Sequence, residues 1–374
     1  MFIRIHLNLR KILNFPKITF KITLLYPLIL ALFFMANLNA QVLPNLKQLP
    51  SLPDKEGFAG MLGGVSKGEL FCMGGANFPE KRPWEGGKKK WYDQIYKLEK
   101  GEKWIELKQK MPSPSAYGVS VSYQDNIIVV GGSDEIKHSN KVTAYKWTGD
   151  SMQITAFPDL PEPLSNMAGT LVNSLIIIAG GNNTPTSLPL RKCFGFDLEN
   201  PKLGWFELPP ISGSERVQPI CASYNGVFYL FSGEAAWMTT KNERFRYILQ
   251  DGYAFTPIKL KDKWTGSWIP LCPLPKGVSA AGSPLPVLNN GTIVFWGGVD
   301  AITALHKDPA THKGINQEVF MYSIEKDNWQ YAGKMTDVAA RVTLPVVFWN
   351  GQWVYLSGEI KPGVRTNTVY SIKD

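Results

Sequence analysis

Two glutamates, Glu234 and Glu359, each directly follow a Ser-Gly pair at the end of a short apolar run. A carboxyl group can donate or accept a proton, so two glutamates at one site could serve as the acid and the base of a reaction. The question for the rest of the chain is whether its elements bring these two residues together.

The two Ser-Gly pairs belong to a set of six small-residue doublets, each at the end of an apolar strand. The other four are Gly-Gly, and the six lie at positions 74–75, 131–132, 180–181, 232–233, 297–298 and 357–358, with spacings of 49 to 65 residues. A period near 50 with a strand ending in Gly-Gly is typical of kelch repeats. The sequence therefore predicts an all-β fold, a six-bladed kelch-type β-propeller.

Each repeat shows the same order of signals. An inner strand leads into a tight turn, as at Asp125-Asn126, Asn225-Gly226 or Asn350-Gly351. Asn-Gly is a strong hairpin signal because both turn positions need positive φ. The second strand ends at the doublet, and after a variable loop an aromatic residue marks a third strand. A tryptophan often opens the fourth strand. We interpret these aromatic residues as packing between blades and not as a stack that binds ligand.

The last repeat lacks a fourth strand, because the chain stops soon after Tyr370. The segment from Leu46 to Pro53 reads like the fourth strand and link of the other repeats. We therefore expect the N-terminal strand to complete the last blade, which would remove the exposed edges of an open array. A closed ring explains residues 41–374 as a single domain.

In a propeller, the loops after the second strands and the links into the inner strands emerge on one face. The polar candidates for a site on that face come from both kinds of segment: Asn77, Glu234, Glu359, Lys361 and Arg365 on the loops, and Tyr117, Arg216 and Arg341 on the links. Arginine offers a planar fork for a carboxylate, and the glutamates offer proton transfer. The alternative is that these charges neutralise one another as structural ion pairs.

Residues 1–40 have the pattern of a secretory signal peptide: five basic residues, no acidic residue, an apolar stretch from Ile22 to Met35, and Ala40 before Gln41. An uncleaved membrane anchor is the weaker alternative, because the apolar run is shorter than the ~20 residues of a spanning helix and Pro27 interrupts it. The sequence predicts a cleaved signal at 1–40, a periplasmic location and no membrane contact in the mature form.

The chain has a formal charge of +9, and removal of the five basic residues of the signal would leave +4. That charge is ordinary for a soluble domain and gives no reason to expect a nucleic-acid partner. We interpret Lys88-Lys89-Lys90 as a solvated surface run and not as a phosphate site.

The four cysteines match no zinc or redox spacing, and a propeller of this size needs no disulfide. The histidines His306 and His312 lie six residues apart, which fits no metal-ligand spacing. We also find no Ser/His/Asp arrangement and no nucleotide-binding loop. The sequence therefore predicts neither a metal nor a cofactor.

The segment Ser357 to Thr366, which reads Ser-Gly-Glu-Ile-Lys-Pro-Gly-Val-Arg-Thr, closely resembles the signature of the bacterial sialic acid mutarotases (N-acetylneuraminate epimerases), which are exported six-bladed kelch propellers. Further stretches agree: 57–60 (Gly-Phe-Ala-Gly), 74–78 (Gly-Gly-Ala-Asn-Phe) and 116–120 (Ala-Tyr-Gly-Val-Ser). In the better-known members the signature lies mid-chain and precedes the stretches that correspond to 57–60 and 116–120. Here it follows them, so the chain looks like a cyclically permuted branch of that family.

The resemblance implies that Glu359 and Arg365 are the catalytic pair. It also implies a mutarotase, an isomerase that interconverts the α- and β-anomers of N-acetylneuraminate or a related acidic sugar by opening the ring. Glu234 is the candidate for a second proton-transfer group, and Arg216, Arg341, Tyr117, Asn77 and Lys361 are the candidates for substrate binding, all six from their place in the repeat.

Two other classes of function are open to a kelch propeller, because the fold alone does not define an activity. The first is a non-catalytic module that binds a glycan or a protein. The second is a sugar hydrolase, for which no feature of the sequence argues specifically.

Overall fold

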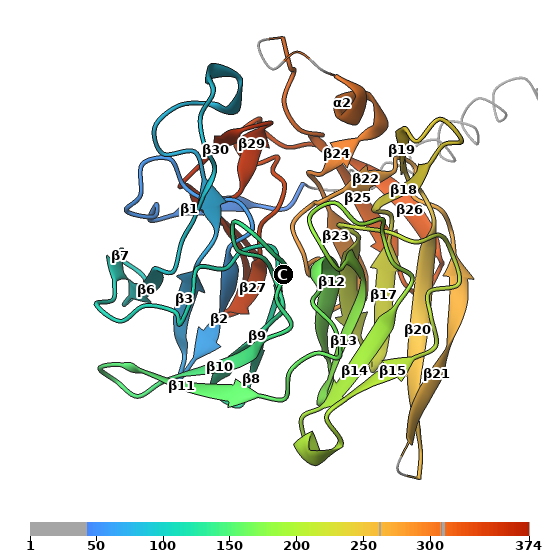
Figure 1. Ribbon diagram of the computed structural model, residues 1–374, viewed down its shortest axis with the longest axis horizontal. Helices are drawn as coiled ribbons and strands as arrows, with labels where there is room; N and C mark the ends of the chain where they lie inside the picture. Colours follow the sequence, from blue (N-terminus) through green and yellow to red (C-terminus); the bar gives the residue numbers. More distant parts are fainter. Residues whose placement is uncertain (1–42, 262, 307, 309–310, 374) are drawn as a thin grey trace, which may run out of the picture. The chain divides into compact units, whose positions relative to one another are not determined.

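The computed structural model describes residues 43–261, 263–306, 308 and 311–373. In this part of the chain, six β-sheets are arranged around a central axis, as Figure 1 shows. The predicted all-β, six-bladed propeller is confirmed. The proposed signal peptide lies outside the described residues. Among the described residues, no helix is long and apolar enough to cross a membrane.

Five of the blades have four antiparallel strands each. Their strands are β2 (Leu62–Ser66), β3 (Glu69–Met73), β6 (Ile95–Glu99) and β7 (Lys103–Glu106) in blade 1; β8 (Val119–Tyr123), β9 (Asn126–Val130), β10 (Val142–Trp147) and β11 (Met152–Phe157) in blade 2; β12 (Ser165–Val172), β13 (Leu175–Asn182), β14 (Cys193–Asp197) and β15 (Trp205–Leu208) in blade 3; β16 (Ile220–Tyr224), β17 (Val227–Phe231), β20 (Gly252–Leu260) and β21 (Lys263–Leu271) in blade 4; and β27 (Val346–Trp349), β28 (Gln352–Leu356), β31 (Val369–Lys373) and β1 (Leu46–Leu49) in blade 6.

Blade 5 is different, because its sheet has only the three strands β23 (Thr292–Phe295), β25 (Glu318–Ser323) and β26 (Asn328–Lys334). The segment in the place of its inner strand contains Pro284 and Pro286, which have no N–H to donate to a ladder. It contacts β23 through the isolated bridge between Val287 and Ile293.

Blade 6 closes the ring in the predicted way. Strand β1 pairs antiparallel with β31, with Leu46 opposite Ile372 and Leu49 opposite Val369. The start and the end of the described chain therefore share one sheet, and no blade is left with a missing neighbour.

The predicted turns are present with one shift. In blades 1, 4 and 6, both central turn residues have positive φ, as in Asn225-Gly226 at 47° and 77°. In blade 2 the turn is Gln124-Asp125, one residue earlier than the predicted Asp125-Asn126, since Asn126 already pairs with Lys146 in the ladder.

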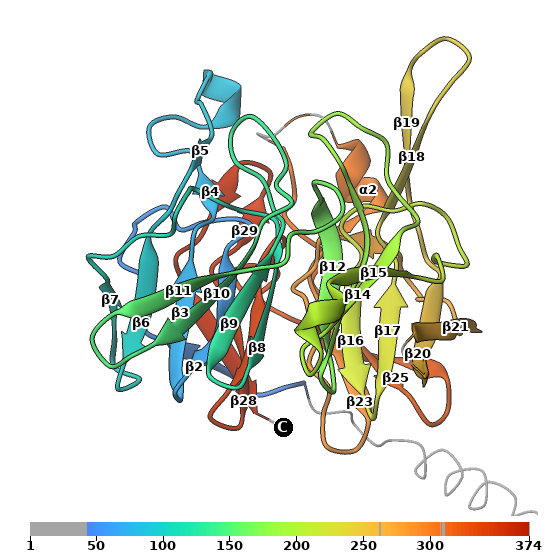
Figure 2. The same ribbon diagram turned by 60° about the horizontal axis from the view of Figure 1, so that its bottom comes forward.

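Short hairpins extend the loops at one end of the sheets, as Figure 2 shows for β4, β5, β18, β19 and β29. The elements that do not belong to the blade sheets are β4 (Ala76–Asn77), β5 (Lys90–Trp91), β18 (Glu234–Met238), β19 (Arg244–Ile248), β22 (Val278–Ser279), β24 (Val299–Asp300), β29 (Glu359–Lys361), β30 (Val364–Arg365), the helix α2 (Ala301–Leu305) and the 3-10 turns η1 (Pro83–Glu85) and η2 (Pro201–Leu203). The glutamates singled out in the sequence begin two of these hairpins.

One residue from each blade forms a closed ring of backbone hydrogen bonds at the axis. The ring runs through Gly60, Tyr117, Asn166, Gln218, Ala280 and Thr343. The N–H of each of these residues donates to the carbonyl of the ring residue in the preceding blade, and Gly60 donates to Thr343, over 2.6 to 3.0 Å. All six residues have φ between 51° and 66°. We call these six residues the axial ring.

The doublets form a second set of bonds between blades. The N–H of the second glycine donates to a carbonyl two residues before the axial-ring residue of the next blade, as from Gly132 to Leu164 at 2.9 Å and from Gly358 to Phe58 at 2.8 Å. This second position has φ between 85° and 110° in all six blades, a region that favours glycine alone. The first position is left-handed, at 55° to 82°, which serine also adopts.

The fourth-strand tryptophans lie between blades, as the sequence predicted. Indole N–H groups reach back to a carbonyl in the link of the preceding blade: Trp104 to Pro50, Trp205 to Pro158, Trp268 to Pro209 and Trp329 to Cys272, at 2.8 to 3.1 Å. All four cysteines are free.

The second glycine of a doublet offers a test of the fold. We expect Gly132→Ala to lower the free energy of unfolding by ~2–4 kcal/mol, because φ is 98° and the added Cβ would lie 2.8 Å from the Ala116 carbonyl oxygen. Gly68→Ala is the control, with positive φ but nothing within 4 Å of its Cβ, and should cost about 1 kcal/mol. Urea unfolding measures both, and equal losses would contradict the crowding at the doublet.

Candidate active site

Glu359 and Arg365 face each other on the hairpin that follows the last doublet. They are register partners of β29 and β30, and Arg365 Nη2 lies 2.9 Å from Glu359 Oε2. Their side chains are 17% and 5% exposed. The sequence spacing of six residues is what a tight hairpin needs to place the two side chains together.

The Arg365 guanidinium has donors to spare. It lies 4.7 Å from the centre of the Phe78 ring, which covers one face. Its Nε and Nη1 atoms are buried and have no hydrogen-bond partner in the described part of the chain. Because a buried unpaired donor is costly, an anionic ligand with several oxygen acceptors would satisfy this group.

Burial raises the pKa of Glu359 above its ordinary value, while the positive charges of Arg365 and Lys89 and the Gly363 N–H oppose the shift. Gly363 donates to Glu359 Oε1 over 3.3 Å. A carboxyl group with a raised pKa, beside a cation, is a candidate for proton transfer.

Tyr117 forms the base of this site. It belongs to the axial ring, and its side chain packs against Gly60, where any Cβ would lie 2.6 Å from the tyrosine ring. Burial raises its pKa to about 12, with the charge of Arg365 opposing. Tyr117 was predicted to bind substrate, and the structure brings it to the Glu359–Arg365 pair.

Lys89 is a member of the site that the sequence analysis missed. Its Nζ lies 4.2 Å from the centre of the Tyr117 ring and 4.5 Å from that of Trp91. Burial lowers its pKa to about 8, with Arg365 acting in the same direction and Glu359 against it. The prediction of a solvated Lys88-Lys89-Lys90 run holds for Lys88 and Lys90, which are exposed, and is wrong for Lys89.

A signal for Lys89 was present in the sequence. Lys89 and Trp91 lie two residues apart, and in an extended chain such residues point to the same side. The three lysines are therefore not equivalent: Lys89 points to the side of Trp91, and Lys88 and Lys90 are exposed.

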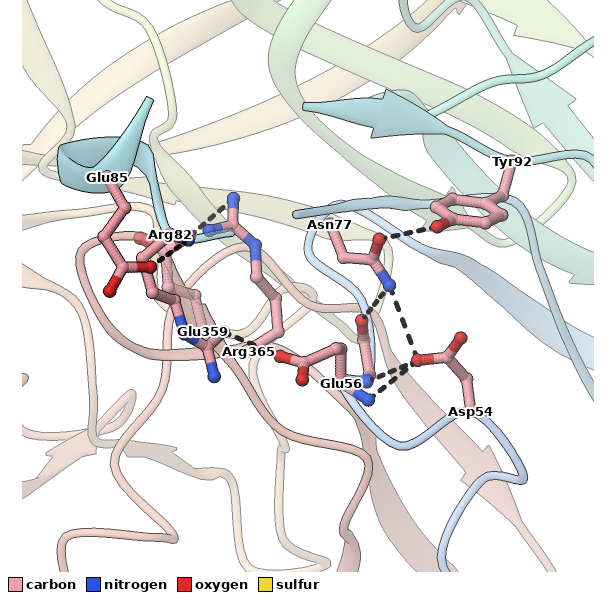
Figure 3. Close-up of polar contacts among 9 residues, drawn as sticks. Asp54, Glu56, Asn77, Arg82, Glu85, Tyr92, Glu359 and Arg365 are labelled. Atoms are coloured by element: carbon pink, nitrogen blue, oxygen red, sulfur yellow. Dashed lines mark hydrogen bonds and ion pairs between the residues drawn. The ribbon is translucent and has the colours of Figure 1, made fainter. Parts of the chain in front are cut away.

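The loop of blade 1 lies over the hairpin of blade 6. A Cβ on Gly363 would lie 2.7 Å from Pro83 and 3.1 Å from Trp84, both on η1. Arg82 at the start of η1 pairs with Glu56 at 2.7 Å, as Figure 3 shows. The packing of η1 against Gly363 covers the hairpin that carries the Glu359–Arg365 pair.

Asn77 supports the site and does not face it. It is buried; its amide donates to the Gly57 carbonyl at 2.9 Å, and it accepts from the Tyr92 hydroxyl at 2.7 Å (Figure 3). Asp54 binds the backbone N–H groups of Glu56 and Gly57 at 2.9 Å each. These bonds fix the segment 54–57, just before the axial ring.

Arg216 and Arg341, two predicted substrate ligands, are held inside the protein. Arg216 pairs with Asp251 and donates to the Ser232 carbonyl at 3.0 Å. Arg341 donates to the Ser357 carbonyl at 2.8 Å and to the Thr368 carbonyl at 2.7 Å. Both are buried, and the bonds they make stabilise the two Ser-Gly doublets, a reason for their placement that the repeat alone could not reveal.

Glu234 and Lys361 lie apart from the pair. Glu234 binds Arg246 through both oxygens, with Arg246 Nε at 2.7 Å, and among the described residues it shares no ion pair with Arg365. Lys361 is exposed on β29. The structure therefore brings together Glu359, Arg365 and Tyr117 from the predicted set, with Lys89 added.

The residue after each doublet pairs with the residue just before the axial-ring position of the same blade. The residues after the doublets are Ala76, Ser133, Asn182, Glu234, Val299 and Glu359, one per blade. Asn182 accepts from the Asn166 amide at 2.9 Å and lies 3.2 Å from His138 Nε2. Uncharged polar groups thus adjoin Tyr117 on the blade 3 side, because Asn166 follows it in the axial ring.

Comparison with known proteins shows which families the chain resembles. Residues 33–154 match the family described as N-acetylneuraminate epimerase. Among curated relatives, the N-acetylneuraminate epimerase of Salmonella arizonae is 26% identical over 239 residues, 58% of each chain. The protein of the same name from Pasteurella multocida is 24% identical over 242 residues, 59% of each chain.

The alignment thus spans less than two thirds of these relatives' length. A solved structure entitled "Structure of YjhT" superposes with a TM-score of 0.61 at 15% identity, covering 86% of this chain and 95% of that one. At this identity the superposition shows the propeller fold alone. The sequence matches indicate distant similarity to N-acetylneuraminate epimerases.

The ion pair can be tested by titration. We expect Arg365→Met to raise the pKa of Glu359 further, because the substitution removes the cation that opposes the effect of burial. Carbon-13 NMR of the Glu359 carboxyl group over a pH series measures this. Arg246→Met, at the equivalent arginine beside Glu234, is the matched control and should leave Glu359 unchanged. Identical titration of Glu359 in both variants would contradict the pairing.

Proposed function

We propose that this protein is a mutarotase that interconverts the anomers of N-acetylneuraminate or a closely related acidic sugar. The observation that carries the proposal is the buried Glu359–Arg365 pair, in which two arginine donors have no partner in the described chain. The distant similarity to N-acetylneuraminate epimerases supports the same substrate class.

The reaction needs only proton transfers. A base takes the proton of the anomeric hydroxyl, an acid protonates the ring oxygen, and the ring opens to a ketone. Closure on the other face of the carbonyl gives the other anomer. Glu359 has the position and the raised pKa for one of these transfers, and no metal or cofactor is required.

Arg365 is the residue that would bind the sugar carboxylate. Its unpartnered Nε and Nη1 atoms lie on opposite edges of the guanidinium, so each can donate to a different oxygen of the ligand, while Nη2 keeps Glu359 in place. One arginine would thereby orient both the substrate and the catalytic carboxyl group.

The order of the motifs is part of the proposal. A linear sequence alignment of cyclically permuted chains can follow only one of the two exchanged segments. Sequence coverage of 58% against fold coverage of 86% and 95% is consistent with such an exchange. Closed propellers accept permutation because their termini meet in one blade. We further propose export to the periplasm through residues 1–40.

The main rival is a kelch module that binds an acidic glycan without changing it. It would use Arg365 in the same way but would have no need of a carboxyl group with a raised pKa beside it. A hydrolase is a weaker rival, since Glu234 lies in a separate ion pair and offers Glu359 no second carboxylate.

Anomer exchange tests the function directly. We expect the wild type to accelerate the conversion of α- to β-N-acetylneuraminate, freshly released by a sialidase, and Glu359→Gln to lose ~10²–10⁴-fold in rate, because the amide cannot exchange the proton. Proton NMR of the anomers measures both. Glu106→Gln, on the outer strand of blade 1, is the control.

Three outcomes separate the candidates. Saturable binding of the sugar with the uncatalysed rate of exchange would support the binding module. Release of free sugar from an intact sialoside would support the hydrolase. Unchanged exchange in Glu359→Gln would overturn the assignment of that residue.

The carboxylate contact makes a separate prediction. We expect Arg365→Lys to lower kcat/KM for the acidic sugar by about 10-fold or more, because a compact ammonium cannot hold Glu359 and the sugar carboxylate at once in the way a planar guanidinium can. With the carboxamide of the sugar as substrate, wild type and Arg365→Lys should differ much less. An equal effect of the substitution on both substrates would mean that Arg365 does not bind the carboxylate.

A further inference from the structure

The proposed reaction needs a second proton-transfer group, and the contacts of Glu234 exclude the candidate taken from the repeat. Glu234 is bound by Arg246 on its own hairpin. Arg365 is ruled out because a guanidinium does not give up its proton in proteins. Tyr117, with a pKa of about 12, is too weak an acid near neutral pH.

Lys89 has the geometry that the role requires. Its ammonium lies against the ring of Tyr117 and the ring of Trp91, which hold it by cation–π contact. In the described part of the chain it makes no hydrogen bond and no ion pair, so its three donors are available to a ligand. Lys89 as a whole is only partly exposed to solvent.

The groups that face Lys89 come from three elements. Glu359 and Arg365 belong to the hairpin β29–β30 of blade 6, and both act electrostatically on Lys89. Tyr117 comes from the axial ring in blade 2, and Trp91 from β5 of blade 1. A sugar whose carboxylate binds Arg365 would therefore have Glu359 and Lys89 within the same small site.

We propose that Lys89 is the second proton-transfer group of this site and acts on the ring oxygen of the acidic sugar. The proposal rests on the proposed mutarotase function. Lys89 comes from the loop of blade 1 and Glu359 from the hairpin of blade 6. Because the two groups approach from different elements, they can act on two different oxygens of one sugar.

The proton balance closes over one cycle. Glu359 takes the proton of the anomeric hydroxyl, the C–O bond to the ring oxygen breaks as the carbonyl forms, and the Lys89 ammonium gives its proton to the ring oxygen. After rotation about the carbon chain, the new hydroxyl adds to the other face of the carbonyl. It returns its proton to the Lys89 amine, and the carbonyl oxygen recovers a proton from Glu359.

The pKa shifts support these roles. Burial moves the pKa of Glu359 up and that of Lys89 down, to about 8, so the two proton affinities approach each other. Below about pH 8 Lys89 is charged and can act as the acid. As the pH rises through that value the ammonium is lost, so catalysed exchange should fall.

The test compares Lys89→Arg and Lys89→Met with the wild type and with Lys88→Met, a control at the exposed neighbour. We expect both Lys89 variants to lose ~10²–10³-fold in kcat for anomer exchange. Lys89→Arg keeps the charge and should keep the KM within a few-fold. The wild-type fall in rate near pH 8 should be absent from its pH profile.

Rescue gives a readout that a structural role would not move. Small primary amines should restore part of the rate to Lys89→Ala, with the degree of rescue depending on the pKa of the amine, and should not affect Glu359→Gln. Full kcat and an unchanged pH profile in Lys89→Arg would overturn the proposal while leaving the mutarotase function intact. No acceleration by the wild type would overturn both.

Discussion

The whole structure depends on the axial ring of six backbone hydrogen bonds. Each blade contributes one N–H and one carbonyl, and every ring residue adopts the left-handed conformation. Such a conformation costs a residue other than glycine free energy of order 1–3 kcal/mol, which the surrounding bonds must offset. The left-handed backbone also sets the direction in which the side chains of the axial-ring residues point. For Tyr117 this direction brings the side chain to Arg365 and Lys89.

The doublets explain why only some glycines are replaceable. The second position, with φ near 100°, is glycine in every blade, whereas serine occurs at the first position in blades 4 and 6. There the hydroxyl groups of Ser232 and Ser357 bond to the next blade, at Val278 and Phe58 respectively. What looked in the sequence like a sign of chemistry is, for the serines, a bond between blades.

The periodic features could be predicted from the sequence, and the irregular ones could not. The doublets occur in all six repeats and the fourth-strand tryptophans in four of them, so these features predicted the number of blades and the closure by β1. The irregular inner segment of blade 5 depends on Pro284 and Pro286 within a single repeat. Lys89 reaches the site through the variable loop of blade 1, whose sequence is not repeated in the other blades. Likewise, Arg216 and Arg341 looked like ligands because a one-dimensional pattern places them on a face without showing whether that position is buried.

Blades 4 and 6 share one local construction, and their difference shows what makes a site. Both have a buried arginine that donates to the doublet serine, then Ser-Gly-Glu, then an arginine on the returning strand of a hairpin. Arg246 in blade 4 is 57% exposed, whereas Arg365 in blade 6 is 5% exposed. The loop of blade 1, with η1, Phe78 and Lys89, packs against the blade 6 hairpin. Arg246 binds both oxygens of the buried Glu234 and is itself open to solvent, while burial leaves Arg365 with unsatisfied donors and raises the pKa of Glu359. The same four residue types therefore form an ion pair with an exposed arginine in one blade and a candidate catalytic pair with a buried arginine in the other.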